Sequence, residues 1–91
     1  MSGRTRTLGD LLTTLRHSRG FSQVELSGRL GHIRGMSQSA ISRIENDDYF
    51  PDAGQLEAIL RALETTQRDM THARELAIAA VVIGHRLEAA P

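Results

Sequence analysis

The chain of 91 residues is long enough for one small domain with a single hydrophobic core. It contains no cysteine, which excludes disulfides and thiolate metal sites, and it has so few aromatic residues that the core must be aliphatic. The longest uncharged apolar segment, residues 76–84, is far shorter than the roughly 20 residues of a membrane span. The polar N-terminus does not resemble a signal peptide. We therefore expect a cytoplasmic protein without a membrane partner.

The net charge of zero conceals an uneven distribution. Residues 1–45 hold seven arginines against three acidic residues, whereas residues 46–91 hold four arginines against eight acidic residues. A positive half joined to an acidic half is typical of a protein that binds phosphate groups with one side only. Chance clustering in a short chain is the alternative explanation.

Residues 1–6 have no apolar periodicity, and we expect a flexible basic arm. Its two arginines, Arg4 and Arg6, are placed to contact a phosphate or a minor groove, as basic arms of other DNA-binding folds do. Simple solvated disorder explains the arm equally well.

The first predicted helix spans residues 8–19. Its leucines follow the amphipathic spacing i, i+3, i+4, i+7, at Leu8, Leu11, Leu12 and Leu15. Thr7 is the expected N-cap, with Asp10 three residues later, and Gly20 is expected to end the helix in a left-handed conformation.

The second predicted helix begins with a capping box formed by Ser22 and Glu25. Its apolar face is expected to consist of Val24, Leu26 and Leu30. Gly28 in its interior costs about 1 kcal/mol relative to alanine, so this helix must depend on tertiary packing. Residues 31–36 then form a turn in which Ile33 is expected to be buried.

The third predicted helix spans about residues 37–46, with Ser37 as its N-cap. Ala40, Ile41 and Ile44 share one narrow apolar face. The side chains that point away from this face are Ser39, Ser42, Arg43 and Asn46, with Gln38 at its edge. Amide and guanidinium groups on such a surface match the hydrogen-bonding edges of base pairs in a major groove.

The fourth predicted helix is capped by Asp52 with Gln55 three residues later. Its apolar positions are Leu56, Ile59, Leu60 and Leu63. In the connection before it, Tyr49, Phe50 and Pro51 are expected to pack against the helices beneath.

The last predicted helix spans residues 67–89 and carries a stripe of apolar and small residues. The stripe consists of Met70, Ala73, Ala77, Ala80, Gly84 and Leu87, and it is widened by Leu76 and Ile83. Between residues 76 and 84 every side of this helix is apolar, so more than one side must be buried. We therefore divide the chain into an arm (1–6), a domain (7–65) and a C-terminal dimerisation helix (66–91). A helix buried within its own chain is the alternative.

Several spaced elements together resemble the Xre/Cro-type helix-turn-helix family of phage repressors and bacterial regulators. They are the segment Gln23-Val24-Glu25-Leu26, the segment from Gly35 to Asn46, and Pro51, preceded by Leu15-Arg16 and Gly20-Phe21-Ser22. The resemblance covers residues 8–63. It implies an all-α, five-helix, lambda-repressor-like domain whose second helix crosses the DNA backbone and whose third enters the major groove.

The resemblance also implies roles for single residues. Gln23 would anchor a phosphate, and the residues facing bases or the flanking backbone would be Ser37, Gln38, Ser39, Ser42 and Arg43. The family's ion pair between the first and third helices would join Arg16 to Glu45. This chain departs from the family by about four extra residues between the second and third helices, which either lengthen the second helix or enlarge the connection. Either change brings His32 and Arg34 near the DNA backbone.

No pattern in the sequence predicts catalysis, a cofactor or a metal site. The four histidines do not follow metal-ligand spacing, and the serines lack a recognisable histidine and acid partner. The leading hypothesis is therefore a homodimeric transcriptional regulator, expected to be a repressor, that binds double-stranded DNA at a roughly palindromic site. The alternative is an antitoxin or anti-regulator whose last helix covers a different protein.

Overall fold

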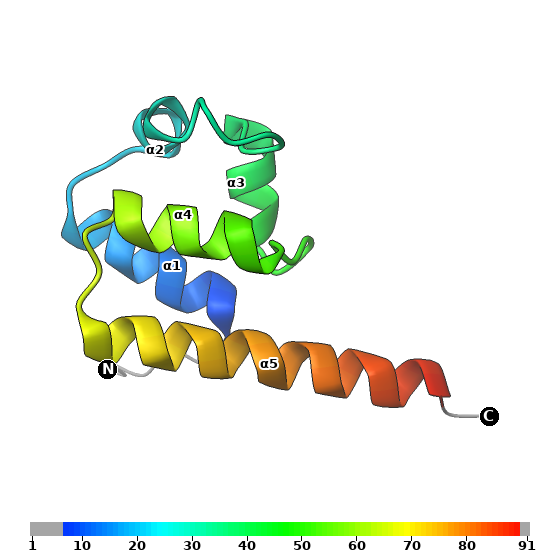
Figure 1. The fold of residues 1–91 in the computed structure, drawn as a ribbon. Coiled ribbons are helices and arrows are strands. Elements are labelled where there is room, and N and C mark those ends of the chain that lie inside the picture. The colour runs from blue at the N-terminus through cyan, green and yellow to red at the C-terminus, as the bar shows by residue number, and fades with distance from the viewer. Residues whose placement is uncertain (1–6, 90–91) are drawn as a thin grey trace.

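The computed structural model describes the backbone of residues 7–89 and the side chains of residues 7–80 (Figure 1). It contains five helices and, within residues 7–89, no strand, which confirms the all-α prediction. The helices are α1 (Leu8–Ser18), α2 (Gln23–Arg29), α3 (Gln38–Glu45), α4 (Ala53–Ala62) and α5 (Gln67–Ala89). The predicted arm with Arg4 and Arg6 lies outside the described residues.

The helix ends follow the capping signals of the sequence. The hydroxyl of Thr7 accepts the backbone N–H of Asp10 at 3.1 Å, and the hydroxyl of Ser37 accepts that of Ala40 at 3.2 Å. Full capping boxes start α2 and α4, formed by Ser22 with Glu25 and by Asp52 with Gln55. Since each cap satisfies a backbone donor that the helix itself leaves unpaired, these short helices begin at defined residues.

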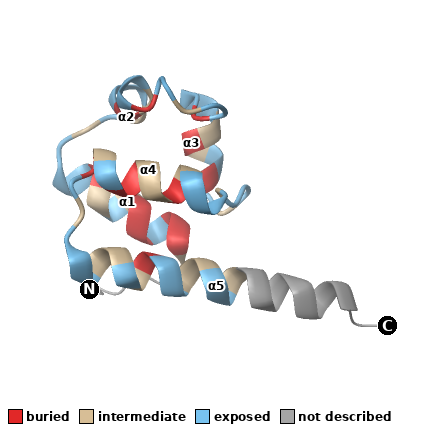
Figure 2. Cartoon of the chain, viewed as in Figure 1, coloured by how far each residue is buried: buried red, intermediate tan, exposed pale blue. Residues whose placement is uncertain are grey.

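The helices enclose one aliphatic core. In Figure 1, α1 and α4 lie above α5, and α2 and α3 lie at the upper end of the molecule. The buried apolar residues come from every helix and from two connections: Leu8, Leu11, Leu12, Leu26, Leu30, Met36, Ile41, Ile44, Leu56, Ile59, Leu60, Leu63 and Ala73. This core fixes α3 by one side only, which leaves its other side at the surface (Figure 2).

The predicted burial of three residues, Val24, Tyr49 and Phe50, is wrong. Val24 is 66% exposed, because it precedes the buried Leu26 by two positions and therefore points to the opposite side of α2 at about 3.6 residues per turn. Tyr49 and Phe50 are 38% and 50% exposed, in a surface connection where the Tyr49 hydroxyl donates to Gln55 Oε1 at 3.3 Å. Ile33 is half-buried and packs against the edge of the core.

The first half of α5 belongs to the core of its own chain. Ala73 is fully buried at 0% exposure, so its predicted contact with a second copy is wrong. Met70, Leu76 and Ala77 are half-buried against the same core. The intramolecular alternative therefore applies to this part of the helix, whereas Ile78 on another side of it is 63% exposed. The surroundings of Ile83, Gly84 and Leu87 are outside the described part of the structure.

Within the described part of the chain, no helix combines the length and apolar character needed to cross a bilayer.

Candidate nucleic-acid interface

The solvent-facing side of α3 carries the polar residues that the sequence singled out. Ile41 and Ile44 are each 2% exposed and hold the opposite side of the helix in the core. The exposed side chains of this surface are Ser37, Gln38, Ser39, Arg43 and Asn46, and Ser42 is half-buried. Because α3 is eight residues long and packs by one side, its outer surface has the size and chemistry of a major-groove reading helix.

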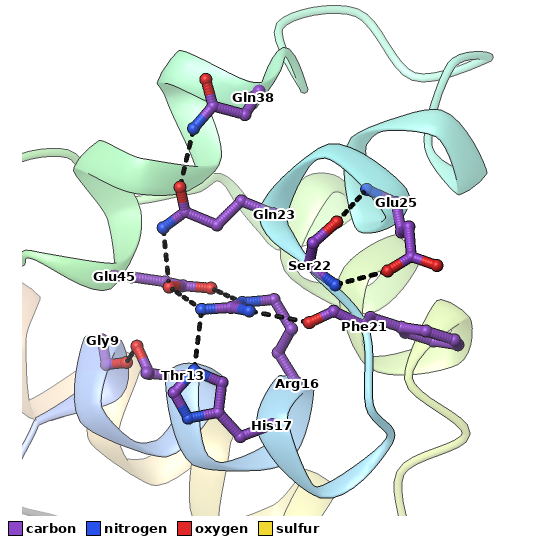
Figure 3. A network of polar contacts seen from close by, with 10 residues as sticks. All are labelled: Gly9, Thr13, Arg16, His17, Phe21, Ser22, Gln23, Glu25, Gln38 and Glu45. Carbon is purple, nitrogen blue, oxygen red and sulfur yellow. Dashed lines mark hydrogen bonds and ion pairs between the residues drawn. The ribbon is translucent and has the colours of Figure 1, made fainter.

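Two glutamines connect the start of this helix to α2. Gln38 Nε2 donates to Gln23 Oε1 at 2.7 Å, and Gln23 Nε2 donates to Glu45 Oε1 at 3.0 Å (Figure 3). Gln38 retains a second N–H and its own Oε1, for which the described residues provide no partner. One donor and one acceptor on the same amide are what a bidentate contact with adenine requires. The contact with Gln23 therefore orients Gln38 without consuming that capacity.

The carboxylate that accepts the hydrogen bond from Gln23 also forms an ion pair between α1 and α3. Arg16 Nε lies 2.7 Å from Glu45 Oε2, and Arg16 Nη2 donates to Glu45 Oε1 at 3.0 Å, so the contact is bidentate. A third Arg16 nitrogen, Nη1, donates to the carbonyl of Phe21 at 2.7 Å. The side chains of Arg16 and Glu45 are only 9% and 7% exposed. This is the ion pair that the family resemblance implied, and it fixes the distal end of α3 against α1.

The electrostatics of the pair follow from its surroundings. Burial alone would raise the pKa of Glu45, but hydrogen bonds from Arg16 and Gln23 and the positive charge of Arg16 outweigh it and lower that pKa below its ordinary value. The hydrogen bond to Glu45 raises the pKa of Arg16. Both groups are therefore charged at neutral pH, and Gln23 is held by a carboxylate that stays ionised.

A contact that the sequence did not predict joins the same C-terminal end of α3 to the start of α1. Asp47, which adopts a positive φ of 62°, accepts the Gly9 N–H at 3.0 Å and the Thr7 hydroxyl at 2.8 Å. The only local signal was an aspartate directly after the end of a helix, a residue type that tolerates the left-handed conformation. Its partners lie about forty positions earlier in the chain, so no local pattern identifies them.

The extra residues between α2 and α3 enlarge the connection. Helix α2 ends at Arg29, and α3 begins at Gln38, so residues 30–37 separate the two helices. Of the two alternatives that the sequence left open, the structure therefore has the longer loop. Arg34 is exposed on this loop, and its carbonyl accepts a hydrogen bond from Gln55 Nε2 at 3.2 Å.

The arginines of the described residues fall into two groups. Four have an engaged guanidinium: Arg16 and Arg74 in ion pairs, Arg19 on the carbonyls of Leu63 and Glu64, and Arg29 over the ring of Phe21. Arg61 interacts only electrostatically, with the carboxylate of Glu57, and the described residues offer no partner to the guanidinium groups of Arg34, Arg43 and Arg68. Two of these, Arg34 and Arg43, lie just before α3 or on it. Two of the unpaired guanidinium groups therefore lie next to or on the polar surface of α3.

A protein-family model described as a helix-turn-helix domain matches residues 7–73, which is more than half of the chain. The chain therefore belongs to this helix-turn-helix domain family. Comparisons with curated proteins and with solved structures found no match. The matched segment includes all of α1 to α4 and the buried first part of α5, so the core that holds α3 and the family assignment coincide.

Proposed function

We propose that the protein is a sequence-specific DNA-binding transcriptional regulator whose reading element is α3. The observation that carries the proposal is the exposed amide and guanidinium surface of Gln38, Ser39 and Arg43 on a helix seated by two fully buried isoleucines. Family membership supports DNA binding in general. Ser37, Ser42 and Asn46 flank this surface and would contact bases or phosphates, and Gln23 would approach the backbone next to Gln38.

We further propose that the protein acts as a homodimeric repressor of the Xre/Cro type. The support lies on α5, where Ile78 is 63% exposed and Ala79 is exposed beside it, although Leu76 and Ala77 pack on the core. An exposed aliphatic side chain in the middle of an otherwise apolar segment is suited to a second copy of the same helix. Two-fold symmetry then implies a roughly palindromic site with half-sites about 10 bp or a multiple of this apart.

The reading role of α3 predicts that the double substitution Gln38→Ala and Arg43→Ala lowers DNA affinity by about 30-fold or more, since each good base contact contributes at least about 1 kcal/mol. The duplex is obtained by selecting binders of the wild-type chain from random sequences, and affinity is measured by fluorescence anisotropy. The matched control is Gln67→Ala with Arg68→Ala, which removes the same residue types from exposed positions on α5. Equal affinity of the two double variants would exclude α3 as the reading element.

The dimer predicts that Ile78→Glu raises the dimer dissociation constant about tenfold or more, because a buried isoleucine contributes about 1.5–3 kcal/mol. The exposure of Ile78 in the single chain means that the fold itself should tolerate the change. Sedimentation velocity over a range of protein concentrations provides the measurement, with Thr71→Glu, another exposed position on α5, as control. A wild-type chain that remains monomeric at high concentration would instead favour the alternative of a different protein partner.

A further inference from the structure

The connection between α2 and α3 is longer than the motif requires. A helix-turn-helix motif typically joins these helices by a turn of about three or four residues. Here residues 30–37 intervene between Arg29 and Gln38. In Figure 1 this connection passes over the top of the molecule, on the side away from α5, and leads directly into α3.

This connection is held in a defined position by contacts at several points. Its first turn closes with a hydrogen bond from the Ile33 N–H to the Leu30 carbonyl at 2.8 Å. Near its end, the Ser27 hydroxyl donates to the Met36 carbonyl at 3.0 Å, and Met36 itself is only 3% exposed. Between these points Gln55 Nε2 donates to the Arg34 carbonyl at 3.2 Å. The backbone of Arg34 is therefore fixed to α4.

The side chain of Arg34 is free although its backbone is fixed. It is exposed, and no described residue pairs with its guanidinium, in contrast to Arg16 and Arg74. Only three residue steps separate Arg34 from the N-cap Ser37, so their Cα atoms lie within about 11 Å of each other. A major groove is about 12 Å wide and is bordered by phosphates. When the start of α3 lies in the groove, Arg34 is therefore beside its border.

We propose that the enlarged connection is a second DNA-contacting element in which Arg34 binds a backbone phosphate next to the groove read by α3. This inference rests on the DNA-binding function proposed above. Gln55 positions the contact by holding the Arg34 carbonyl, and Gly35, at a φ of +82°, turns the chain back towards the buried Met36. A phosphate contact adds affinity and fixes orientation but reads no sequence.

The experiment measures the affinity of the selected duplex between 50 and 200 mM salt for the wild type, Arg34→Ala, Arg34→Lys and Arg68→Ala. Loss of one phosphate contact lowers the slope of log affinity against log salt by about 0.9, so the fall in affinity over this range shrinks about threefold to fourfold. We expect this change in Arg34→Ala only. Arg34→Lys keeps the charge and should keep the slope, and Arg68, exposed on α5, is the control for net charge.

Other results would overturn the inference. An unchanged slope in Arg34→Ala, with or without a lower melting temperature, would mean that Arg34 contacts no phosphate. A loss confined to one base position of the duplex would mean that it reads sequence instead. If the wild type selects no duplex at all, the proposed function fails, and this inference fails with it. If Gln38→Ala and Arg43→Ala together abolish binding but Arg34→Ala leaves the slope intact, only the inference about the connection is lost.

Discussion

Replacement of Glu45 by alanine is expected to lower the free energy of unfolding by about 3–5 kcal/mol, because it leaves the buried Arg16 without its counter-ion. The chain cannot relieve this charge by losing a proton, since arginine stays protonated in proteins. The carbonyl of Phe21 would remain as an acceptor but carries no full charge. Urea unfolding of the purified chain, followed by circular dichroism, measures the change.

The chain contains its own control for the effect of burial. Glu57 and Arg74 form a second bidentate pair between two helices, at 2.8 and 2.9 Å, but their side chains are 33% and 43% exposed. Because water screens exposed charges, Glu57→Ala should lower the free energy of unfolding far less than Glu45→Ala does. If Glu45→Ala and Glu57→Ala lowered the free energy of unfolding by similar amounts, burial would not be what makes the Arg16–Glu45 pair important for stability.

The ion pair of Arg16 with Glu45 also makes the stability of the fold depend on pH, and the pKa shift of Glu45 gives the direction of that dependence. The pKa of Glu45 is lower in the folded chain than in the unfolded one, so its stabilisation is complete above the unfolded value of about 4.3 and is lost as the pH falls through the folded value. The difference in unfolding free energy between the wild type and Glu45→Ala should therefore stay constant down to about pH 4 and narrow below it. A difference that remained constant to pH 3 would show that the ionised carboxylate is not what stabilises the fold.

The helices were predictable from the sequence because their signals are local. A cap such as Ser22 with Glu25 lies within four residues, and the leucine spacing of α1 repeats within two turns. The seven-residue helix α2 is too short for periodicity to define its buried side, which explains the wrong placement of Val24. Which surface an apolar stripe packs against is not local either. The position of Ala73 in the apolar stripe of α5 is the same whether the residue packs on the core of its own chain or on a second copy, so the spacing could not decide between the two.

The candidate site was predictable only in part for a related reason. The polar residues of α3 share one side of a helix, so their exposure followed from spacing alone. The hydrogen bond from Gln38 to Gln23 joins residues 15 positions apart, and the ion pair of Arg16 with Glu45 joins residues 29 apart. The second of these was expected only from the family resemblance. The path of the α2–α3 connection depends on Gln55, which the sequence indicated only as part of a helix cap.

Gly9 shows most clearly what the sequence alone does not reveal. It is the second residue of α1, where alanine would normally favour the helix by up to about 1 kcal/mol. A Cβ atom at this position would stand 2.5 Å from the Glu45 carbonyl oxygen and 2.8 Å from that of Ile44, well inside contact distance. Both atoms belong to the backbone of α3, so neither can rotate away. The absence of a side chain lets α1 approach the end of α3 and receive the carboxylate of Asp47.

Gly9→Ala is therefore expected to lower the free energy of unfolding by about 3 kcal/mol, at the upper end of typical overpacking effects, despite the better helix propensity of alanine. Gly28→Ala is the matched control, because Gly28 also lies inside a helix but a Cβ there meets nothing within 4 Å. In Gly28→Ala the free energy of unfolding should rise by about 0.5–1 kcal/mol, because alanine has a higher helix propensity than glycine. Urea unfolding of both variants tests whether the free energy of unfolding falls in Gly9→Ala and rises in Gly28→Ala. If both substitutions stabilised the chain, α1 and α3 would not be in the close contact that anchors α3.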